Sequence, residues 1–153
     1  MSNLNEKEIK KILEDFRKST DILCSILFTE DGFIIALDQA HISEISENHQ
    51  SLGALCAGVA SLAGNSVETI YDNRKIKQIS IQAGHQLEHD GFHILIESVS
   101  NDVLLSIIFP ISLNFGVILF ELKQVISKLQ KYFSPTEVDG ILGSLSVSNE
   151  RLS

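Results

Sequence analysis

The chain has 153 residues, of which 44% are hydrophobic, and a net charge of −8 from 12 basic and 20 acidic residues. This length and apolar content fit one globular domain that is large enough to bury a core. The acidic balance, without a basic block or stripe along the sequence, removes the electrostatic basis of phosphate binding, so we expect no nucleic-acid partner.

The apolar runs are short. The longest, residues 22–28 and 103–111, fall well below the roughly 20 residues that a membrane-spanning helix needs. The opening sequence MSNLNEKEIKK lacks the apolar stretch of a signal peptide. We therefore expect no transmembrane segment and a cytoplasmic protein. In that reducing compartment, Cys24 and Cys56, both in apolar surroundings, are predicted to be two buried free thiols.

The first predicted element is an amphipathic helix over residues 3–18. Apolar side chains recur through it at helical spacing: Ile9, Ile12, Leu13 and Phe16. Residues 22–28 and 33–37 are short runs rich in strand formers. The Asp31 and Gly32 pair between them favours a tight hairpin turn, so we expect two antiparallel strands.

A polar connection over residues 38–50 leads to a second predicted helix. Ser51 can cap this helix, which should continue to about Tyr71. Residues 75–82 then predict an edge strand, because lysines stand at its start. We expect a loop over residues 84–91.

Two further strands are predicted over residues 92–97 and 103–109, joined by a cluster of turn residues. A last helix follows Asn114 and ends near Phe133, with apolar side chains along one stripe: Ile118, Leu122, Val125, Leu129 and Tyr132. The order helix, two strands, helix, three strands, helix predicts an α+β fold with a five-stranded, mostly antiparallel sheet. Residues 1–133 form this domain, and the Ser- and Gly-rich residues 134–153 are expected to be a flexible tail with at most a short amphipathic turn.

The second predicted helix has two apolar faces. We expect the bulkier face to lie on the chain's own sheet: Leu52, Leu55, Val59, Leu62, Ser66 and Ile70. The smaller face lets another backbone approach closely, either the first or last helix of the same chain or the same helix of a second copy. We favour a symmetric dimer, in which one stripe supplies both sides of the contact and the third strand extends a joint sheet. The predicted interface residues are Gly53, Ala57, Ala60, Gly64, Val67, Ile79 and Ile81.

The remaining face of this helix is small and partly polar. It consists of Ala54, Gly58, Ser61, Asn65 and Glu68. We regard it as a candidate partner-binding surface, with an ordinary solvated helix face as the alternative.

The element order, the small-residue helix and two short sequences resemble the roadblock family of dynein light chains and prokaryotic GTPase regulators. The sequences are FTEDGF at residues 28–33 and LNFGV at residues 113–117, and the resemblance covers residues 6–133. It implies a homodimer or heterodimer with a continuous ten-stranded sheet and paired second helices. It also implies a platform for small Ras-like GTPases or for motor and signalling complexes. Some members of the family accelerate GTP hydrolysis or nucleotide exchange by reshaping the GTPase and perform no chemistry themselves.

Three histidines recur every four residues, as metal ligands do along a helix: His85, His89 and His93. Gly84 and Gly91 oppose a helix there, so we favour exposed loop histidines over a metal site. The sequence has no phosphate-binding or dinucleotide-binding glycine motif, and we expect no metal and no cofactor.

Arg17 and Arg74 are candidates for an arginine donated to a GTPase, and a plain surface role is the alternative. Neither cysteine has a base nearby in the sequence, so no catalytic residue is assigned. The function predicted is a non-enzymatic dimeric scaffold or regulator that binds a small Ras-like GTPase. The alternative function is a small-molecule sensory domain with a pocket between sheet and helices, for which Ser25, His93 and Ser106 are the inward polar candidates.

Overall fold

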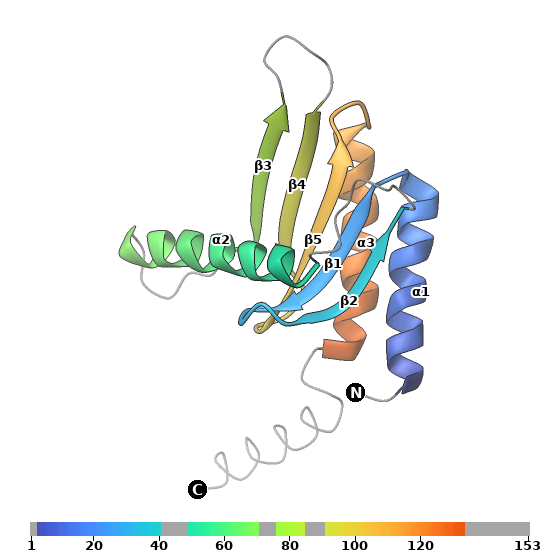
Figure 1. Ribbon diagram of the computed structural model, residues 1–153, viewed down its shortest axis with the longest axis horizontal. Coiled ribbons are helices and arrows are strands. Elements are labelled where there is room, and N and C mark those ends of the chain that lie inside the picture. The colour runs from blue at the N-terminus through green and yellow to red at the C-terminus, as the bar shows by residue number, and fades with distance from the viewer. Residues whose placement is uncertain (1–2, 41–48, 71–75, 85–90, 134–153) are drawn as a thin grey trace, which may run out of the picture.

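The structure is a computed structural model that describes residues 3–40, 49–70, 76–84 and 91–133, with only the backbone for residues 49–53. The predicted tail, residues 134–153, lies outside the described part. The elements follow the predicted order (Figure 1): α1 (Asn3–Thr20), β1 (Cys24–Thr29), β2 (Ile34–Gln39), α2 (His49–Ile70), β3 (Gln78–Gly84), β4 (Gly91–Ser98), β5 (Val103–Pro110) and α3 (Phe115–Phe133).

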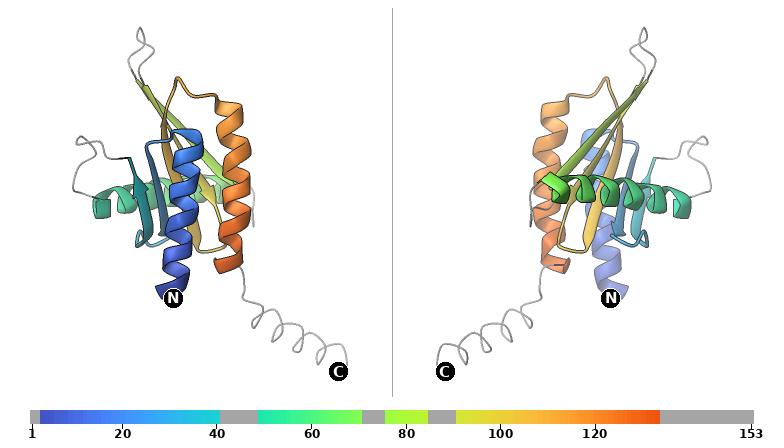
Figure 2. Two further views of the ribbon diagram at one scale, coloured as in Figure 1. Left: turned by 90° about the vertical axis from the view of Figure 1, so that its right-hand side faces the viewer. Right: turned by 90° about the vertical axis from the view of Figure 1, so that its left-hand side faces the viewer.

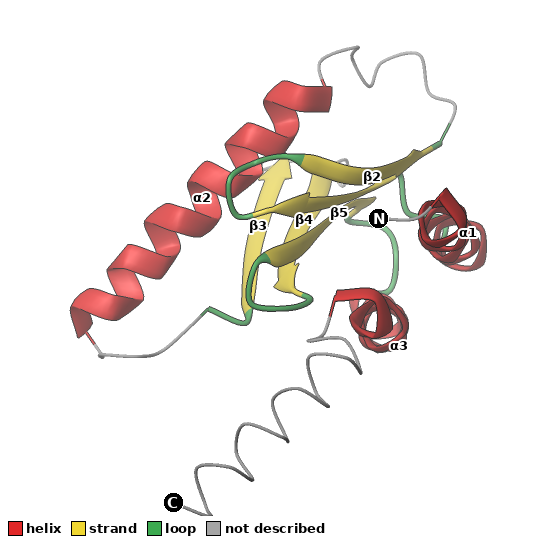
Figure 3. Cartoon of the chain, turned by 90° about the horizontal axis from the view of Figure 1, so that it is seen from below, coloured by secondary structure: helices red, strands yellow, loops and turns green. Residues whose placement is uncertain are grey.

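The five strands form one sheet in the order β2-β1-β5-β4-β3. All four neighbouring pairs are antiparallel, so the predicted fold class is confirmed. Figures 2 and 3 show that α1 and α3 lie side by side on one face of the sheet and that α2 crosses the other face. No helix in the described part of the chain is long and apolar enough to cross a bilayer.

The core has two layers because successive side chains of each strand point to opposite faces of the sheet. The larger layer lies between the sheet and the helices α1 and α3, and includes Leu13, Leu105 and Leu122. The smaller layer lies under α2 and includes Ile26, Phe28 and Ile96. The apolar stripe predicted for the last helix supplies the first layer, because Ile118, Leu122, Val125 and Leu129 are all buried.

The β1–β2 hairpin forms at the predicted Asp-Gly pair. Gly32 has a φ of +90°, which side-chain-bearing residues rarely adopt, and its N–H donates to the Thr29 carbonyl at 2.8 Å. The Thr29 N–H donates to the Phe33 carbonyl at 2.9 Å. A Cβ on Gly32 would also lie 3.2 Å from the Cα of Ala54, so the turn packs directly on α2.

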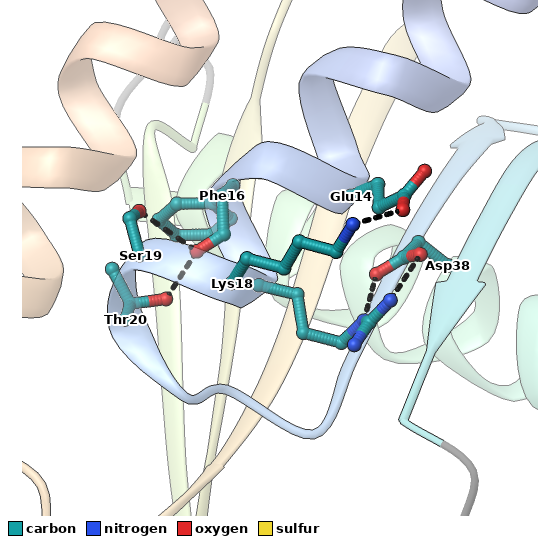
Figure 4. A network of polar contacts seen from close by, with 7 residues as sticks. Glu14, Phe16, Lys18, Ser19, Thr20 and Asp38 are labelled. Carbon is teal, nitrogen blue, oxygen red and sulfur yellow. Dashed lines mark hydrogen bonds and ion pairs between the residues drawn. The ribbon is translucent and has the colours of Figure 1, made fainter.

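Strand β2 extends to Gln39, two residues beyond the predicted end at Leu37. The strand continues because Asp38 pairs with Ser25 and Gln39 pairs with Cys24 of β1. The guanidinium of Arg17 in α1 also donates to both carboxylate oxygens of Asp38, at 2.7 and 3.4 Å. Figure 4 shows Asp38 in this contact at the end of α1. The predicted polar connection therefore begins after β2, and residues 41–48 lie outside the described part.

Helix α1 ends two residues later than predicted. The Phe16 carbonyl accepts hydrogen bonds from the hydroxyls of Ser19 and Thr20, at 3.1 and 2.6 Å (Figure 4). Asp21 has a φ of 61°, and its N–H donates to the Arg17 carbonyl, which closes the helix with a left-handed residue.

Three other predicted boundaries are wrong. Helix α2 begins at His49, so Ser51 lies in its first turn and is not the cap. Gly84 ends β3, Gly91 begins β4 and the two residues pair with each other, so both belong to strands and not to the predicted loop. Gly91 is required by this pairing, because a Cβ there would lie 2.6 Å from the Ala83 carbonyl oxygen. Strand β3 is an edge strand, as predicted.

Candidate functional site

Helix α2 is the candidate site, and its small residues face its own sheet. Cys56 and Ala57 are only 6% and 7% exposed and belong to the apolar layer under the helix. The Cys56 Sγ donates to the Ser106 Oγ of β5 at 3.7 Å. Small side chains are needed here because the sheet and the Gly32 turn approach the helix closely.

The predicted orientation of α2 is therefore wrong. The bulky face was expected on the sheet, but Leu55, Leu62 and Ile70 are exposed, and Val59 is at the limit of exposure. Ala57, predicted at a dimer contact, is buried against the chain's own sheet. The physical reason is the short distance between helix and sheet, which bulky side chains would not fit.

The other predicted interface residues lie as follows. Ala60, Gly64 and Val67 are half-buried on the side of α2 that faces the sheet, and Ile79 and Ile81 are half-buried on β3. Gly53 lies near the start of α2, where only the backbone is described. The prediction that two copies meet through α2 and β3 stays a prediction.

The exposed bulky residues define a surface, called here the bulky stripe: Leu55, Val59, Leu62 and Ile70. Figures 1 and 3 show that α2 extends past β3, so its last turns have no strand beneath them. Phe92 of β4 is exposed too. It shares a sheet face with Ile94 and Ile96 of the layer under α2, so this end of that face is not covered by α2.

The predicted partner-binding face is open to solvent. All five of its residues are exposed: Ala54, Gly58, Ser61, Asn65 and Glu68. A Cβ on Gly58 would meet no atom within 4 Å. This surface, called here the small polar face, is flat because its side chains are short.

A cleft of about 380 Å³ lies beside the small polar face. Its walls come from α2, the β1–β2 turn, the residues before β3, the β4–β5 turn and the strands β3, β4 and β5. Its charged lining residues are Glu30, Asp31, Glu68 and Lys77. Three carboxylates against one ammonium make the cleft acidic, which favours a basic occupant. The lining residues of this cleft were not predicted, because its walls are distant in the sequence.

The two cysteines are buried, as predicted. Burial raises the pKa of the Cys24 thiol to about 12, and it also raises the pKa of Cys56. Such thiols are protonated at neutral pH and poor nucleophiles.

Of the candidate arginines, Arg17 is held by Asp38 and is half-buried, so it is not placed for donation to a partner. Arg74 lies outside the described residues, as do His85 and His89. His93 stacks on Phe109 with ring centres 5.2 Å apart and lies 5.2 Å from the ring of Phe115. Within the described part of the chain, no group of three potential metal ligands occurs.

The polar residues proposed for a sensory pocket do not converge. Ser106 contacts α2, whereas Ser25 points to the opposite face of the sheet, because its neighbours Cys24 and Ile26 belong to the layer under α2. His93 lies against Phe115 of α3. None of these three residues lines the cleft.

Comparison with solved structures identifies the fold. The chain matches MglB of Myxococcus xanthus with a TM-score of 0.73 and 17% identity over 87% of this chain and 92% of that one. It matches the gliding protein MglB of Thermus thermophilus with a TM-score of 0.71 and 18% identity, over 86% and 92% of the two chains. A Roadblock/LC7 domain from Streptomyces avermitilis matches with a TM-score of 0.66 and 13% identity, over 81% and 96%.

The chain has a roadblock-type fold. No protein-family model matches the sequence, and no curated protein does. The roadblock fold was predicted from the element order and the two short sequences, and these structures confirm it.

Proposed function

We propose that this protein is a non-enzymatic, dimeric, cytoplasmic scaffold or regulator that binds a small Ras-like GTPase. The roadblock fold supports the scaffold role, since the family that the sequence resembles uses this fold as a platform for such GTPases. The observation that carries the proposal is the exposed apolar surface of α2, which extends beyond the edge of its own sheet.

The dimer is proposed to form through the bulky stripe and the edge strand β3. The bulky stripe exposes Leu55, Leu62 and Ile70 on one helix, and Phe92 lies exposed on the uncovered part of the sheet. A second copy in two-fold arrangement would place its own overhanging helix over that part of the sheet and bury both surfaces. This proposed interface differs from the one predicted from the sequence, because the small residues of α2 already face the chain's own sheet.

The GTPase is proposed to bind the small polar face. That face is centred about 120° around the helix axis from the bulky stripe, so the dimer contact is proposed to leave it accessible. The acidic cleft beside it favours a partner surface with lysines or arginines. A partner of this charge fits a chain whose net charge is −8.

The experiment uses Gly58→Leu. The new side chain meets no atom of the protein within 4 Å of its Cβ, so we expect an unchanged or slightly higher melting temperature and a large loss of GTPase binding. The full chain is titrated with Ras-like GTPases of the source cell in their GTP and GDP forms, and binding is measured by calorimetry.

The matched control is Gln124→Leu, which adds the same side chain at an exposed position of α3. It should bind like the wild type. The proposed surface is wrong if both variants bind equally well, and the proposed partner is wrong if no GTPase binds the wild type. The rate of GTP hydrolysis with and without the protein then separates a regulator from a tether.

A further inference from the structure

The helices α1 and α3 concentrate the positive charge of an otherwise acidic chain. Together they carry eight of its twelve lysines and arginines and only five of its twenty acidic residues. Their net charge is therefore +3, against −8 for the whole chain. This asymmetry is not visible along the sequence, because the two helices come from opposite ends of the domain and meet only in the fold (Figure 2).

The lysines lie on the outer side of this helical layer. On α3, Ile118, Leu122 and Leu129 face the sheet, and the exposed residues include Lys123, Lys128 and Lys131 but no acidic residue. On α1 four lysines are exposed, Lys7, Lys10, Lys11 and Lys18, together with three carboxylates, Glu6, Glu8 and Asp15. Within the described part of the chain, only Lys18 of these seven lysines forms an ion pair, with Glu14 at 2.6 Å.

Large apolar side chains stand exposed among these lysines. Phe120 is 62% exposed and Val117 is 52% exposed on α3, and Leu4 is exposed at the start of α1. Tyr132 of α3 donates to the Glu8 carboxylate at 2.6 Å, which ties the end of α3 to the start of α1. The result is a firm two-helix surface with lysines and separate apolar side chains, called here the basic helical face.

We infer that the basic helical face docks on an anionic lipid bilayer. Lysines near a membrane surface are attracted by anionic headgroups, and exposed Phe and Leu side chains enter the boundary between headgroups and acyl chains. Every exposed basic residue of this face is a lysine. Nucleic-acid recognition favours the planar fork of arginine, whereas lysine and arginine are equally effective at an anionic membrane surface, so a face with lysines alone fits the bilayer better.

The net charge of −8 does not prevent this docking. The Debye length is about 10 Å at 0.1 M ionic strength, which is about the diameter of one helix. The acidic cleft is lined by residues of α2. Figure 3 shows that α2 lies on the opposite face of the sheet from α1 and α3. The charges of the cleft are therefore largely screened from a bilayer that contacts α1 and α3.

The test is cosedimentation of the full chain with vesicles of phosphatidylcholine, with and without phosphatidylserine. We expect binding only to the vesicles that contain phosphatidylserine, and a loss of binding at high salt. Lys123→Glu changes the charge by two and should weaken binding about 30-fold. Phe120→Ser should weaken it without a change of charge.

Two matched controls make the result specific. Lys77→Glu changes the net charge by the same amount at an exposed position beside the acidic cleft, and Phe33→Ser removes an exposed phenyl ring from the β1–β2 turn. Both should bind vesicles like the wild type. Equal binding to neutral and anionic vesicles, equal effects of Lys123→Glu and Lys77→Glu, or tighter binding to duplex DNA than to phosphatidylserine vesicles would each overturn the inference.

Discussion

The substitution Leu62→Ala tests the central element of the proposed dimer. Leu62 is 71% exposed in the single chain, although it is a large apolar residue in the middle of the bulky stripe. If the stripe is an interface, truncation removes apolar surface that only the dimer buries. If it is ordinary surface, truncation changes little.

The expected magnitude follows from the exposed fraction. At about 0.8 kcal/mol per buried CH₂, the three carbons lost from leucine are worth about 2.4 kcal/mol on full burial. Since 71% of the residue is available for burial, each copy loses about 1.7 kcal/mol and the dimer about 3.4 kcal/mol. The dimer dissociation constant should therefore rise about 300-fold.

Sedimentation equilibrium over a wide range of concentrations measures this constant. Leu4→Ala is the matched control, because Leu4 is 66% exposed on α1, away from α2. The control should dimerise like the wild type, and the stability of the isolated monomer should change by less than about 0.5 kcal/mol in both variants. A wild-type chain that is monomeric at all concentrations, or equal dissociation constants for the two variants, would refute the reasoning.

The remaining predictions concern stability and are checked by urea or thermal denaturation. Gly58→Ala should stabilise the protein by up to about 1 kcal/mol, because the new Cβ meets no atom within 4 Å and alanine favours the helix; a loss of stability would contradict this. Gly91→Ala should instead destabilise it by about 1 to 3 kcal/mol, because its Cβ would lie 2.6 Å from a backbone carbonyl oxygen. Asp38→Ala should cost about 1.5 to 3 kcal/mol through the lost hydrogen bonds from the half-buried Arg17, and an unchanged midpoint would show that the pair contributes nothing. Burial raises the pKa of Cys24 from 9.0 to about 12, so the unfolded chain loses the thiol proton first and the free energy of unfolding falls between about pH 9 and pH 12; Cys24→Ala should flatten that fall.

Much of the fold was predictable because its signals are local. The Asp31 and Gly32 pair specifies a turn whose φ of +90° only glycine adopts easily. Apolar periodicity identified all three helices and the buried stripe of α3. Boundaries were missed where a distant residue decides them, as at Asp38, whose strand position is held by Arg17 from another element.

The orientation of α2 on the sheet was predicted wrongly, and the error has one cause. Helical periodicity shows which residues of α2 share a face, but it does not show which face lies on the sheet. The rule that bulky apolar residues are buried assigned Leu62 to the core. In the structure the Gly32 turn approaches Ala54 closely, so the small face of α2 lies on the sheet and Leu62 is exposed. This contact joins two segments that are distant in the sequence, so no local pattern reveals it.

The attachment of α2 divides the helix into two parts with different evolutionary constraints. Cys56 and Ala57, near its start, are its only buried residues among those whose side chains are described, and they anchor it to the sheet. Beyond Val59, the outward side chains of Leu62 and Ile70 belong to a surface that the chain's own core does not use. Substitutions of these side chains can alter the choice of binding partner while the domain keeps its folding stability, so new assemblies can arise one residue at a time.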